Sequence, residues 1–355
     1  MDNDKNKYMD KKRHKVALIL EALGKGGTEA YVAQLLTYLQ RNSYCVEVVV
    51  LSQTTDENTF WNIPVKAVNL IGLPFFLRRN SFDICHLHLY ANLLPATIGA
   101  KCARIPVVTT IHMPIRSWGL KHRFYTRSAM ALADRVVGVS MDALGGERGA
   151  NIYPQPIPAP VASEFLGIQR ERQPGGDLKI LSVGRLAKEK NLDVLLRAMG
   201  KAVYRLRTRA VLAHFGEGPL RHELIELAEE LGVTVEWNGI QQRSEIARAL
   251  STADVFVLPS KFEGSPLAAI EAMAIGVPTI LSSFSSAQEL VKDRLTGHIF
   301  PIGDADALAD LLVWHSENPD LSTEIGMRGR AFALENFSEE QCLGHYVRIY
   351  SDLLA

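Results

Sequence analysis

The chain of 355 residues is about twice as long as a typical domain, so two domains are expected, and its 47% hydrophobic content is ordinary for a protein with large buried cores. No run of about 18 apolar residues occurs, which excludes a membrane-spanning helix. The formal net charge is zero, and no stripe of basic and aromatic residues points to a nucleic-acid partner.

The beginning of the chain differs from the rest in charge. Residues 1–14 are polar and charged and lack the apolar centre of a signal peptide, so a disordered tail is predicted there. Up to Glu164 the chain has 19 Lys and Arg against 13 Asp and Glu. This basic half could favour contact with an anionic membrane surface or a phosphate-bearing acceptor, but a mildly uneven, solvated surface charge is the preferred interpretation.

The cysteines indicate a reduced, cytoplasmic protein. Cys45, Cys85, Cys102 and Cys342 show no ligand spacing, so neither a disulfide framework nor a zinc site is expected. Cys45 and Cys85 lie at or in strand-like apolar runs, and both are predicted to be buried thiols.

Strand-like and helical patterns alternate through the first half of the chain. The predicted strands cover residues 16–21, 45–51, 83–89, 106–111 and 134–140. The predicted helices cover residues 28–41, 91–103 and 123–133. Nearly continuous Val, Ile and Leu runs are typical of strands buried on both faces, so the pattern predicts a parallel, doubly wound sheet of α/β class.

The alternation breaks at 154–160, where four prolines exclude a regular helix or central strand, and we expect an interdomain region over 154–177. It then resumes, with strands predicted at 178–184, 210–216, 233–237, 254–259 and 277–281 and helices at 192–206, 220–231, 244–250 and 267–275. Two Rossmann-like domains are therefore predicted, over 15–160 and 161–337. An amphipathic final helix, 338–355, is expected to pack back on the first domain.

In open parallel sheets, ligands bind beyond the carboxyl ends of the strands, and two such edges facing each other would enclose one cleft. The most informative residues at such an edge are Glu263, Gly264, Ser265 and Pro266, which follow a predicted strand and open a helix. Ser265 suits the N-cap and Pro266 the first helical position. The free amides of that helix would bind an anion, and Gly264 would let the backbone approach it closely.

Glu271 is the single non-apolar residue between Leu267 and Ile275. A helix that is apolar all round is buried, and an unpaired buried carboxylate is costly. A vicinal diol such as the ribose of a nucleotide would satisfy it, because each carboxylate oxygen accepts a hydroxyl hydrogen. An internal cap or an ion pair with another segment remains the alternative.

Arg185 and Lys190 follow the first strand of the second predicted domain, at the same sheet edge. Together with helix amides, these two cations could neutralise a diphosphate through charge-assisted contacts. Solvated surface charge is the alternative interpretation of the pair.

The segments GRLAKEKN and FEGSPLAAIEAMAIGVPTI together resemble the retaining glycosyltransferase family 4, the group 1 glycosyltransferases. Glu263 and Glu271 match the E-x7-E motif of that family. GKGGTEAY, TTIHM, VGVS and FGEGPLR follow in the expected order, and the resemblance covers roughly residues 15–355. It implies the GT-B fold, in which two Rossmann-like domains face a central cleft.

The resemblance assigns donor contacts to the second domain. Arg185 and Lys190 would hold the donor diphosphate, and Glu271 would bind the ribose hydroxyls. Glu263, with the backbone of Gly264–Leu267, would face the transferred sugar and the distal phosphate.

In the first domain, Gly26 and Gly27 would let the first loop approach the donor phosphate and the acceptor. His112 would point into the cleft near the transferred sugar, although a structural, hydrogen-bonded histidine is the alternative. His88 is a weaker candidate, because at most one of His86 and His88 is expected to face the cleft.

The remaining expectations concern base, mechanism and partners. Ile240 would lie near the nucleobase. The sequence does not identify that base, so the donor would be either UDP-linked or GDP-linked. The catalytic residues would be Arg185, Lys190, Glu263 and His112, with no cofactor and no metal. The acceptor would be a glycan or a lipid-linked precursor, reached by a cytoplasmic protein in peripheral contact with the inner membrane face. A nucleotide-sugar epimerase and a non-catalytic nucleotide-sugar-binding subunit are the alternatives.

Overall fold

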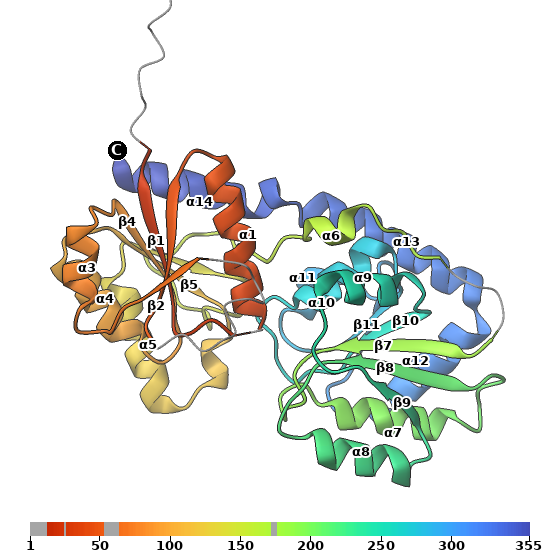
Figure 1. Ribbon diagram of the computed structural model, residues 1–355. Coiled ribbons are helices and arrows are strands. Elements are labelled where there is room, and N and C mark those ends of the chain that lie inside the picture. Colours follow the sequence, from red (N-terminus) through yellow and green to blue (C-terminus); the bar gives the residue numbers. More distant parts are fainter. Residues whose placement is uncertain (1–12, 25, 53–63, 172–175) are drawn as a thin grey trace, which may run out of the picture.

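The computed structural model describes residues 13–24, 26–52, 64–171 and 176–355, so most of the predicted disordered tail lies outside the described residues. Two six-stranded sheets organise the chain, and every strand pair within them is parallel. Figure 1 shows them side by side, with helices covering the faces of each sheet. The predicted pair of doubly wound α/β domains is confirmed.

The first sheet has the strand order β3-β2-β1-β4-β5-β6. Its strands are β1 (Lys15–Leu20), β2 (Cys45–Val50), β3 (Val65–Ala67), β4 (Ile84–His88), β5 (Val107–Ile111) and β6 (Arg135–Gly138). Its helical segments are α1 (Gly27–Arg41), α3 (Leu73–Arg79), α4 (Leu93–Cys102), η1 (Ile115–Ser117) and α5 (Leu120–Leu132). β4 and β5 are buried along their whole length, as their apolar runs predict.

The second sheet repeats this plan, with the order β12-β11-β10-β7-β8-β9. Its strands are β7 (Leu178–Val183), β8 (Ala210–Phe215), β9 (Thr234–Trp237), β10 (Val255–Leu258), β11 (Thr279–Ser282) and β12 (His298–Phe300). Its helices are α7 (Leu192–Ala202), α8 (Arg221–Glu230), α9 (Arg243–Ser251), α10 (Leu267–Ile275), α11 (Ala287–Leu290) and α12 (Ala305–Glu317). In both sheets the strand order reverses beside the first strand, and these switch points are where open α/β sheets bind ligands.

Several local expectations were wrong. β3, α3 and β12 were not predicted, because their short sequences lack a clear period. The helix beginning at Leu192 ends at Ala202 and not at Leu206. Cys45 is exposed rather than buried because it opens β2, whose burial begins three residues later, whereas Cys85 in the middle of β4 is buried as expected. No helix within the described ranges is long and apolar enough to cross a membrane.

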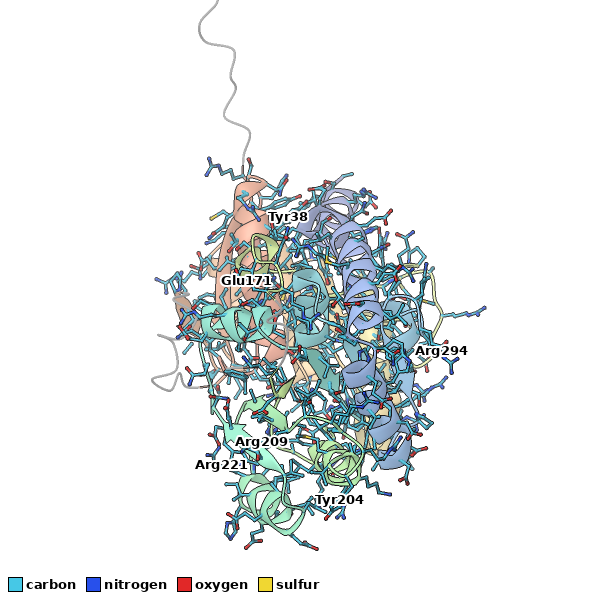
Figure 2. All side chains as sticks on the ribbon, turned by 90° about the vertical axis from the view of Figure 1, so that its right-hand side faces the viewer. Tyr38, Glu171, Tyr204, Arg209, Arg221 and Arg294 are labelled. Atoms are coloured by element: carbon cyan, nitrogen blue, oxygen red, sulfur yellow. The ribbon has the colours of Figure 1, made fainter. Side chains whose placement is uncertain are left out.

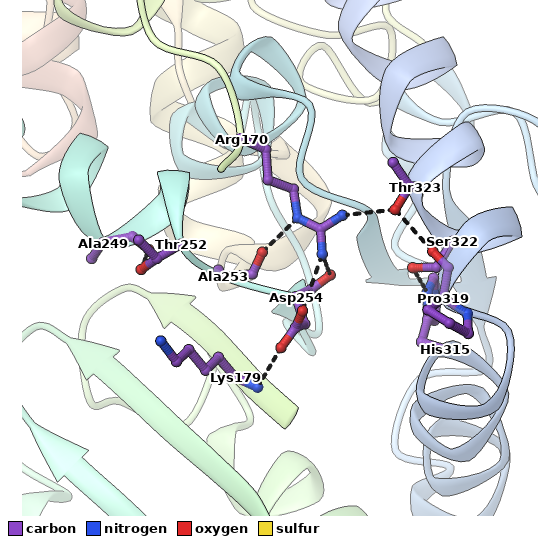
Figure 3. Close-up of polar contacts among 10 residues, drawn as sticks. All are labelled: Arg170, Lys179, Ala249, Thr252, Ala253, Asp254, His315, Pro319, Ser322 and Thr323. Atoms are coloured by element: carbon purple, nitrogen blue, oxygen red, sulfur yellow. Dashed lines mark hydrogen bonds and ion pairs between the residues drawn. The ribbon is translucent and has the colours of Figure 1, made fainter. Parts of the chain in front are cut away.

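The chain between the sheets contains a short helix, α6 (Ser163–Leu166), and ends in a polar anchor. The buried Arg170 guanidinium donates to the Ala253 carbonyl oxygen at 2.7 Å and to Asp254 and Thr323 (Figure 3). The Asp254 carboxylate also accepts from the Lys179 amide at 2.9 Å. These contacts join the connecting segment to the start of β7. They also join it to the long helix α13 (Pro319–Asn336) near the end of the chain.

The final helix, α14 (Glu339–Leu354), lies on the first domain, while α13 lies over the second (Figure 1). Its N-cap is Ser338, whose side chain accepts from the Gln341 amide. Tyr346 and Tyr350 of α14 are fully buried and enter a chain of hydrogen bonds inside the first domain. Surface side chains such as Tyr204 and Arg294, by contrast, project away from the molecule (Figure 2).

This buried chain of hydrogen bonds has one possible direction. Its contacts run from the Ile157 carbonyl through the side chains of Tyr31, Tyr346, Thr110, His86 and Tyr350, at 3.1, 3.0, 2.7, 2.8 and 2.6 Å in that order. A carbonyl can only accept, so Tyr31 donates to it, and each next group then donates to the one before. His86 therefore carries its proton on Nε2. Burial holds the pKa of this histidine well below its usual range, so the ring is neutral.

Candidate active site

A cavity of about 600 Å³ opens between the two sheets at their switch points. Glycines after β1 contribute one wall, and residues at or after the ends of β7, β8, β9 and β10 contribute the others. The predicted donor residues that line it are Gly26, Gly27, Arg185, Lys190, Ile240, Glu263, Ser265, Pro266, Leu267 and Glu271. Segments far apart in the sequence thus meet in one space, as expected for the carboxyl edges of two facing sheets.

Glu263 and Lys190 form the polar centre of this cavity. The Lys190 ammonium donates to Glu263 Oε1 at 2.6 Å, and the Ser260 hydroxyl donates to the same oxygen at 2.6 Å. Glu263 is buried, whereas Lys190 remains partly exposed and Arg185 is exposed at the rim. Burying a carboxylate costs less free energy when it is paired with a cation. Here the paired cation, the Lys190 ammonium, also faces the cavity.

Helix α10 points its amino end at the same cavity. The helix spans Leu267–Ile275 as predicted, but its N-cap is Pro266 and not Ser265. Ser265 does not cap the helix, because its hydroxyl instead accepts from the Ala159 amide at 2.9 Å in the interdomain segment. The first amides of a helix lack intrahelical partners, so they and the positive end of the helix dipole favour an anion there.

Glu271 is buried in α10, as the apolar sequence around it predicts, but it has a protein partner. Arg243, the first residue of α9, donates from Nη2 to Glu271 Oε1. The structure therefore contains the ion pair that the sequence left open as an alternative to a ligand. Both residues also line the cavity, so the pair lies at the ligand space and not in the sealed core.

The two domains touch directly beside the cavity. A Cβ atom added to Gly264 would lie 1.8 Å from the carbonyl oxygen of His112, and one added to Gly27 would lie 3.6 Å from a Leu267 methyl carbon. Gly264 lines a separate interdomain space of about 530 Å³ and not the main cavity. Its missing side chain is what lets the segments that follow β5 and β10 approach each other.

His112 faces a smaller cavity of about 270 Å³ in the first domain, together with His88, Tyr90 and Trp118. His88 Nδ1 lies 2.9 Å from His112 Nε2, and the Tyr31 ring packs edge-on against His112. Burial lowers the pKa of His112 to about 3, so both imidazoles are neutral near pH 7.

Of the two neighbouring histidines, His88 lines this cavity and His86 does not, in agreement with the expectation that at most one of them faces the cleft. Both lie on the same face of β4, because residues two apart on a strand share one face, and their ring centroids are 4.1 Å apart with the planes tilted by 41°. His86 lies deeper, in the hydrogen-bond chain with Tyr350, while His88 reaches the cavity.

Ile240 lies on the rim of the main cavity, where the loop after β9 meets the loop after β8. The Gly216 amide donates to the Gly239 carbonyl at 2.7 Å, and Gly216 has a φ of +144°, which strongly favours glycine. Ile240 itself is exposed at this rim, beside Gln241 and Glu217. Backbone groups, one apolar side chain and these two polar residues thus form this end of the cavity.

Arg243, Gln241 and Glu217 line the cavity and were not predicted. Arg243 stands within an ordinary polar stretch, QQRSEIAR, and nothing in its local sequence distinguishes it from Arg248 five residues later. The sequence pointed to such a residue only indirectly, because a buried Glu271 carboxylate in an apolar helix requires a partner.

Two family models match the chain: the description "Glycosyltransferase Family 4" over residues 25–144 and "Glycosyl transferases group 1" over residues 167–332. The putative colanic acid biosynthesis glycosyltransferase WcaL of Salmonella typhimurium is 31% identical over 202 residues. That match covers 52% of this chain and about half, 49%, of the relative.

Other relatives match over more of the chain. The uncharacterized 41.2 kDa protein in the cps region of Klebsiella pneumoniae is 28% identical over 92% of this chain and 96% of its own length. An Escherichia coli protein named UDP-Gal:alpha-D-GlcNAc-diphosphoundecaprenol alpha-1,3-galactosyltransferase is 26% identical over 69% of this chain and 69% of its own.

The solved structure of Anabaena HepE in complex with UDP and glucose superimposes with a TM-score of 0.82 at 16% identity, covering 96% of this chain and all of HepE. This likeness supports the GT-B arrangement of two facing Rossmann-like domains. The two family matches lie in order, one on each sheet domain, and the segments quoted from the sequence fall within them. The chain belongs to the group 1 glycosyltransferases of glycosyltransferase family 4.

Proposed function

We propose that this protein transfers a sugar from a UDP- or GDP-linked donor to a hydroxyl group of a glycan or lipid-linked acceptor, with retention of the anomeric configuration. The observation that carries the proposal is the main cavity, where Arg185, Lys190 and the amino end of α10 surround one space with the carboxylates of Glu263 and Glu271. Cations and amides suit a diphosphate, and carboxylates suit sugar hydroxyls.

In the proposed reaction the bond between the anomeric carbon and the donor diphosphate breaks, and a bond forms from the acceptor oxygen to the same carbon. The acceptor proton passes to the leaving phosphate oxygen. Arg185, Lys190 and the α10 amides stabilise the charge that develops on the diphosphate. These groups take the part that a magnesium ion plays elsewhere, so addition of EDTA is expected to leave the transfer rate unchanged.

The smaller cavity of the first domain is the proposed acceptor side. Its Tyr90 and Trp118 rings lie 4.5 Å apart at their centroids, and aromatic walls with a few polar groups suit a sugar ring. The E. coli relative is named for a diphosphoundecaprenol acceptor, and WcaL for colanic acid biosynthesis. These names support a role in polysaccharide biosynthesis for this chain.

Exposed apolar side chains on the first domain support peripheral contact with a membrane. Phe75 of α3 and Leu120 and Phe124 of α5 are exposed, with Arg79 and Lys121 exposed beside them in sequence. Aromatic residues flanked by cations suit a membrane interface. Flotation with anionic vesicles at low salt is the test, and absence of the protein from the vesicle fraction would contradict the contact.

The function is tested in two steps. Thermal unfolding with UDP-, GDP- and ADP-sugars first identifies the donor, because a ligand at 100 times its dissociation constant adds about 2.7 kcal/mol of stability. Transfer to lipid-linked and free glycan acceptors is then followed by NMR, with retention expected. Glu271→Ala is expected to lose most of the turnover.

Three outcomes would contradict the proposal, each differently. Conversion of the free donor into an epimer without an acceptor would show a nucleotide-sugar epimerase. Binding without turnover across the acceptor panel would show a non-catalytic subunit. An inverted anomeric configuration in the product would leave the transferase standing but remove its retaining mechanism.

A further inference from the structure

Arg243 occupies an unusual position between the connecting segment and the candidate donor site. It is the first residue of α9, and its side chain is 17% exposed. Its guanidinium lies over the Phe165 ring of α6, 5.2 Å from the ring centre, and Nε lies 3.7 Å from Glu164 Oε1. From there Nη2 donates to Glu271.

Glu271 is bound on one side only. Its Oε1 receives the Arg243 hydrogen bond, whereas Oε2 accepts none from any side chain or backbone group in the described ranges. The side chain is 6% exposed, yet it lines the main cavity together with Arg243. One carboxylate oxygen is thus fixed by protein, and the other is available in the ligand space.

The charge of Glu271 depends on the groups that face it. Burial raises its pKa to about 7, and the negative Glu164 of α6 acts in the same direction, while Arg243 of α9 opposes both. A carboxylate accepts hydroxyl hydrogens on both oxygens, whereas the protonated acid gives up part of this accepting capacity. Without the guanidinium, the acid form would therefore prevail at neutral pH.

We infer that Arg243 is a positioning residue for donor recognition, which favours the charged form of the Glu271 carboxylate and leaves its Oε2 to accept hydroxyl groups of the donor ribose. The inference rests on the proposed function, because it requires a nucleotide in the main cavity. It reconciles the two interpretations of Glu271, since the internal ion pair prepares the ligand contact and does not replace it.

Two features argue against a purely structural ion pair. The Arg243 Nε atom is buried and has no hydrogen-bond acceptor among the described residues. Pairs that serve packing alone normally have their buried donors satisfied. Both partners also line the cavity, so the pair faces the space that also contains Lys190 and Arg185.

Calorimetric titration with a nucleoside diphosphate and its 2′,3′-dideoxy counterpart tests the inference. The probe is whichever of UDP, GDP and ADP binds most tightly. The ratio of the two affinities isolates the ribose contact, because both probes carry the same diphosphate and base. The wild-type protein is expected to prefer the ribose form by about tenfold or more at pH 8, since hydrogen bonds to a charged group are strong.

Arg243→Gln is expected to reduce this preference several-fold at pH 7, and raising the pH is expected to restore it. Arg243→Lys retains the positive charge and is expected to keep most of the preference at pH 7. Glu164→Gln removes the negative neighbour, so it is expected to move the pH dependence in the opposite direction. Unchanged affinity for the dideoxy probe in each variant shows that the cavity itself is intact.

Arg248→Gln is the matched control, because Arg248 lies on the same helix but is 73% exposed and pairs with Glu245 outside the cavity. A ribose preference that is the same in Arg243→Gln and wild type at every pH would overturn the inference. Failure of all three nucleoside diphosphates to bind the wild-type protein would instead overturn the proposed function. The two failures are therefore distinguishable.

Discussion

The two halves of the central cleft use different chemistry. The half built on the second sheet concentrates charge, with Arg185, Lys190, Glu263 and the Arg243–Glu271 pair around one cavity. The half built on the first sheet faces its own cavity with a pair of neutral imidazoles and aromatic rings, and the side chains of Glu21 and Glu29 also line it. We call it the neutral half after its imidazole pair. The charged half is suited to a diphosphate and ribose, and the neutral half to the shape of a sugar.

This contrast has a structural cause. Arg185, Lys190 and Glu263 stand on the loops after β7 and β10, so local sequence is enough to assemble much of that half, whereas Arg243 and Glu271 belong to α9 and α10. The neutral half depends on distant segments, because α14 supplies Tyr346 and Tyr350 to the hydrogen-bond chain beneath β4 and β5. The following variants test first the contact between the two halves and then each half by itself.

The contact between the halves gives the largest expected effect. Gly264→Ala would place a Cβ atom 1.8 Å from the His112 carbonyl oxygen, so the domains must move apart by more than 1 Å. Misplacement of about 1 Å can lower turnover by about 100-fold, and we expect at least that loss in a transfer assay. Gly119→Ala is the control, since nothing lies within 4 Å of its added Cβ, and it should keep wild-type turnover. Equal activity of the two variants would contradict this close approach.

Removal of one cation from the charged half comes next. Lys190→Ala removes the hydrogen bond to Glu263 and the proposed diphosphate contact. A charge-assisted contact of about 1.5–3 kcal/mol corresponds to a loss of about 10- to 150-fold in kcat/KM. Lys188 is exposed two residues earlier, and Lys188→Ala is expected to change kcat/KM by less than about twofold. A similar loss in both variants would indicate general loss of positive charge rather than a specific site.

The neutral half should be sensitive to acid. The unfolded His112 takes up a proton as the pH falls through about 6.5, whereas in the folded protein its pKa is lowered to about 3. The unfolded state therefore binds more protons, and His112 alone should cost about 2 kcal/mol of stability between pH 7 and pH 5.

Urea unfolding at the two pH values measures this effect. His112→Gln is expected to lose about that part of the acid sensitivity, while His222→Gln, whose side chain is 86% exposed, should keep all of it. An unchanged acid sensitivity in His112→Gln would show that the imidazole is not held neutral.

The smallest expected effect concerns the hydrogen-bond chain under the neutral half. Tyr346→Phe leaves the buried Thr110 hydroxyl without its acceptor, which should destabilise the protein by about 1–3 kcal/mol. Tyr204→Phe, at a site 95% exposed, should not change the urea midpoint (Figure 2). Identical midpoints for wild type and Tyr346→Phe would contradict the directed chain.

The sequence predicted the architecture well because strands buried on both faces leave long apolar runs. β4 and β10 were predicted to within one residue at both ends, whereas the short β3 and β12 have too few residues to show a period. The N-cap role predicted for Ser265 was wrong because its hydroxyl accepts a hydrogen bond from the Ala159 amide. No local sequence pattern encodes this tertiary contact.

Much of the candidate site could also be predicted, for the same local reason. Glu263 and Lys190 belong to segments with a recognisable order and meet as expected. Arg243 could not be predicted, because its partner is 28 residues away and its own neighbours are ordinary surface residues. His86 and His88 share one face of β4, so the sequence alone could not show which of them reaches the cavity.

A crystal structure with the tightest-binding nucleoside diphosphate tests the central claim most directly. We expect the diphosphate between Arg185, Lys190 and the amino end of α10, with ribose hydroxyls donating to Glu271 Oε2 while Arg243 still holds Oε1. A nucleotide bound elsewhere, or a ribose turned away from Glu271 into solvent, would contradict the account.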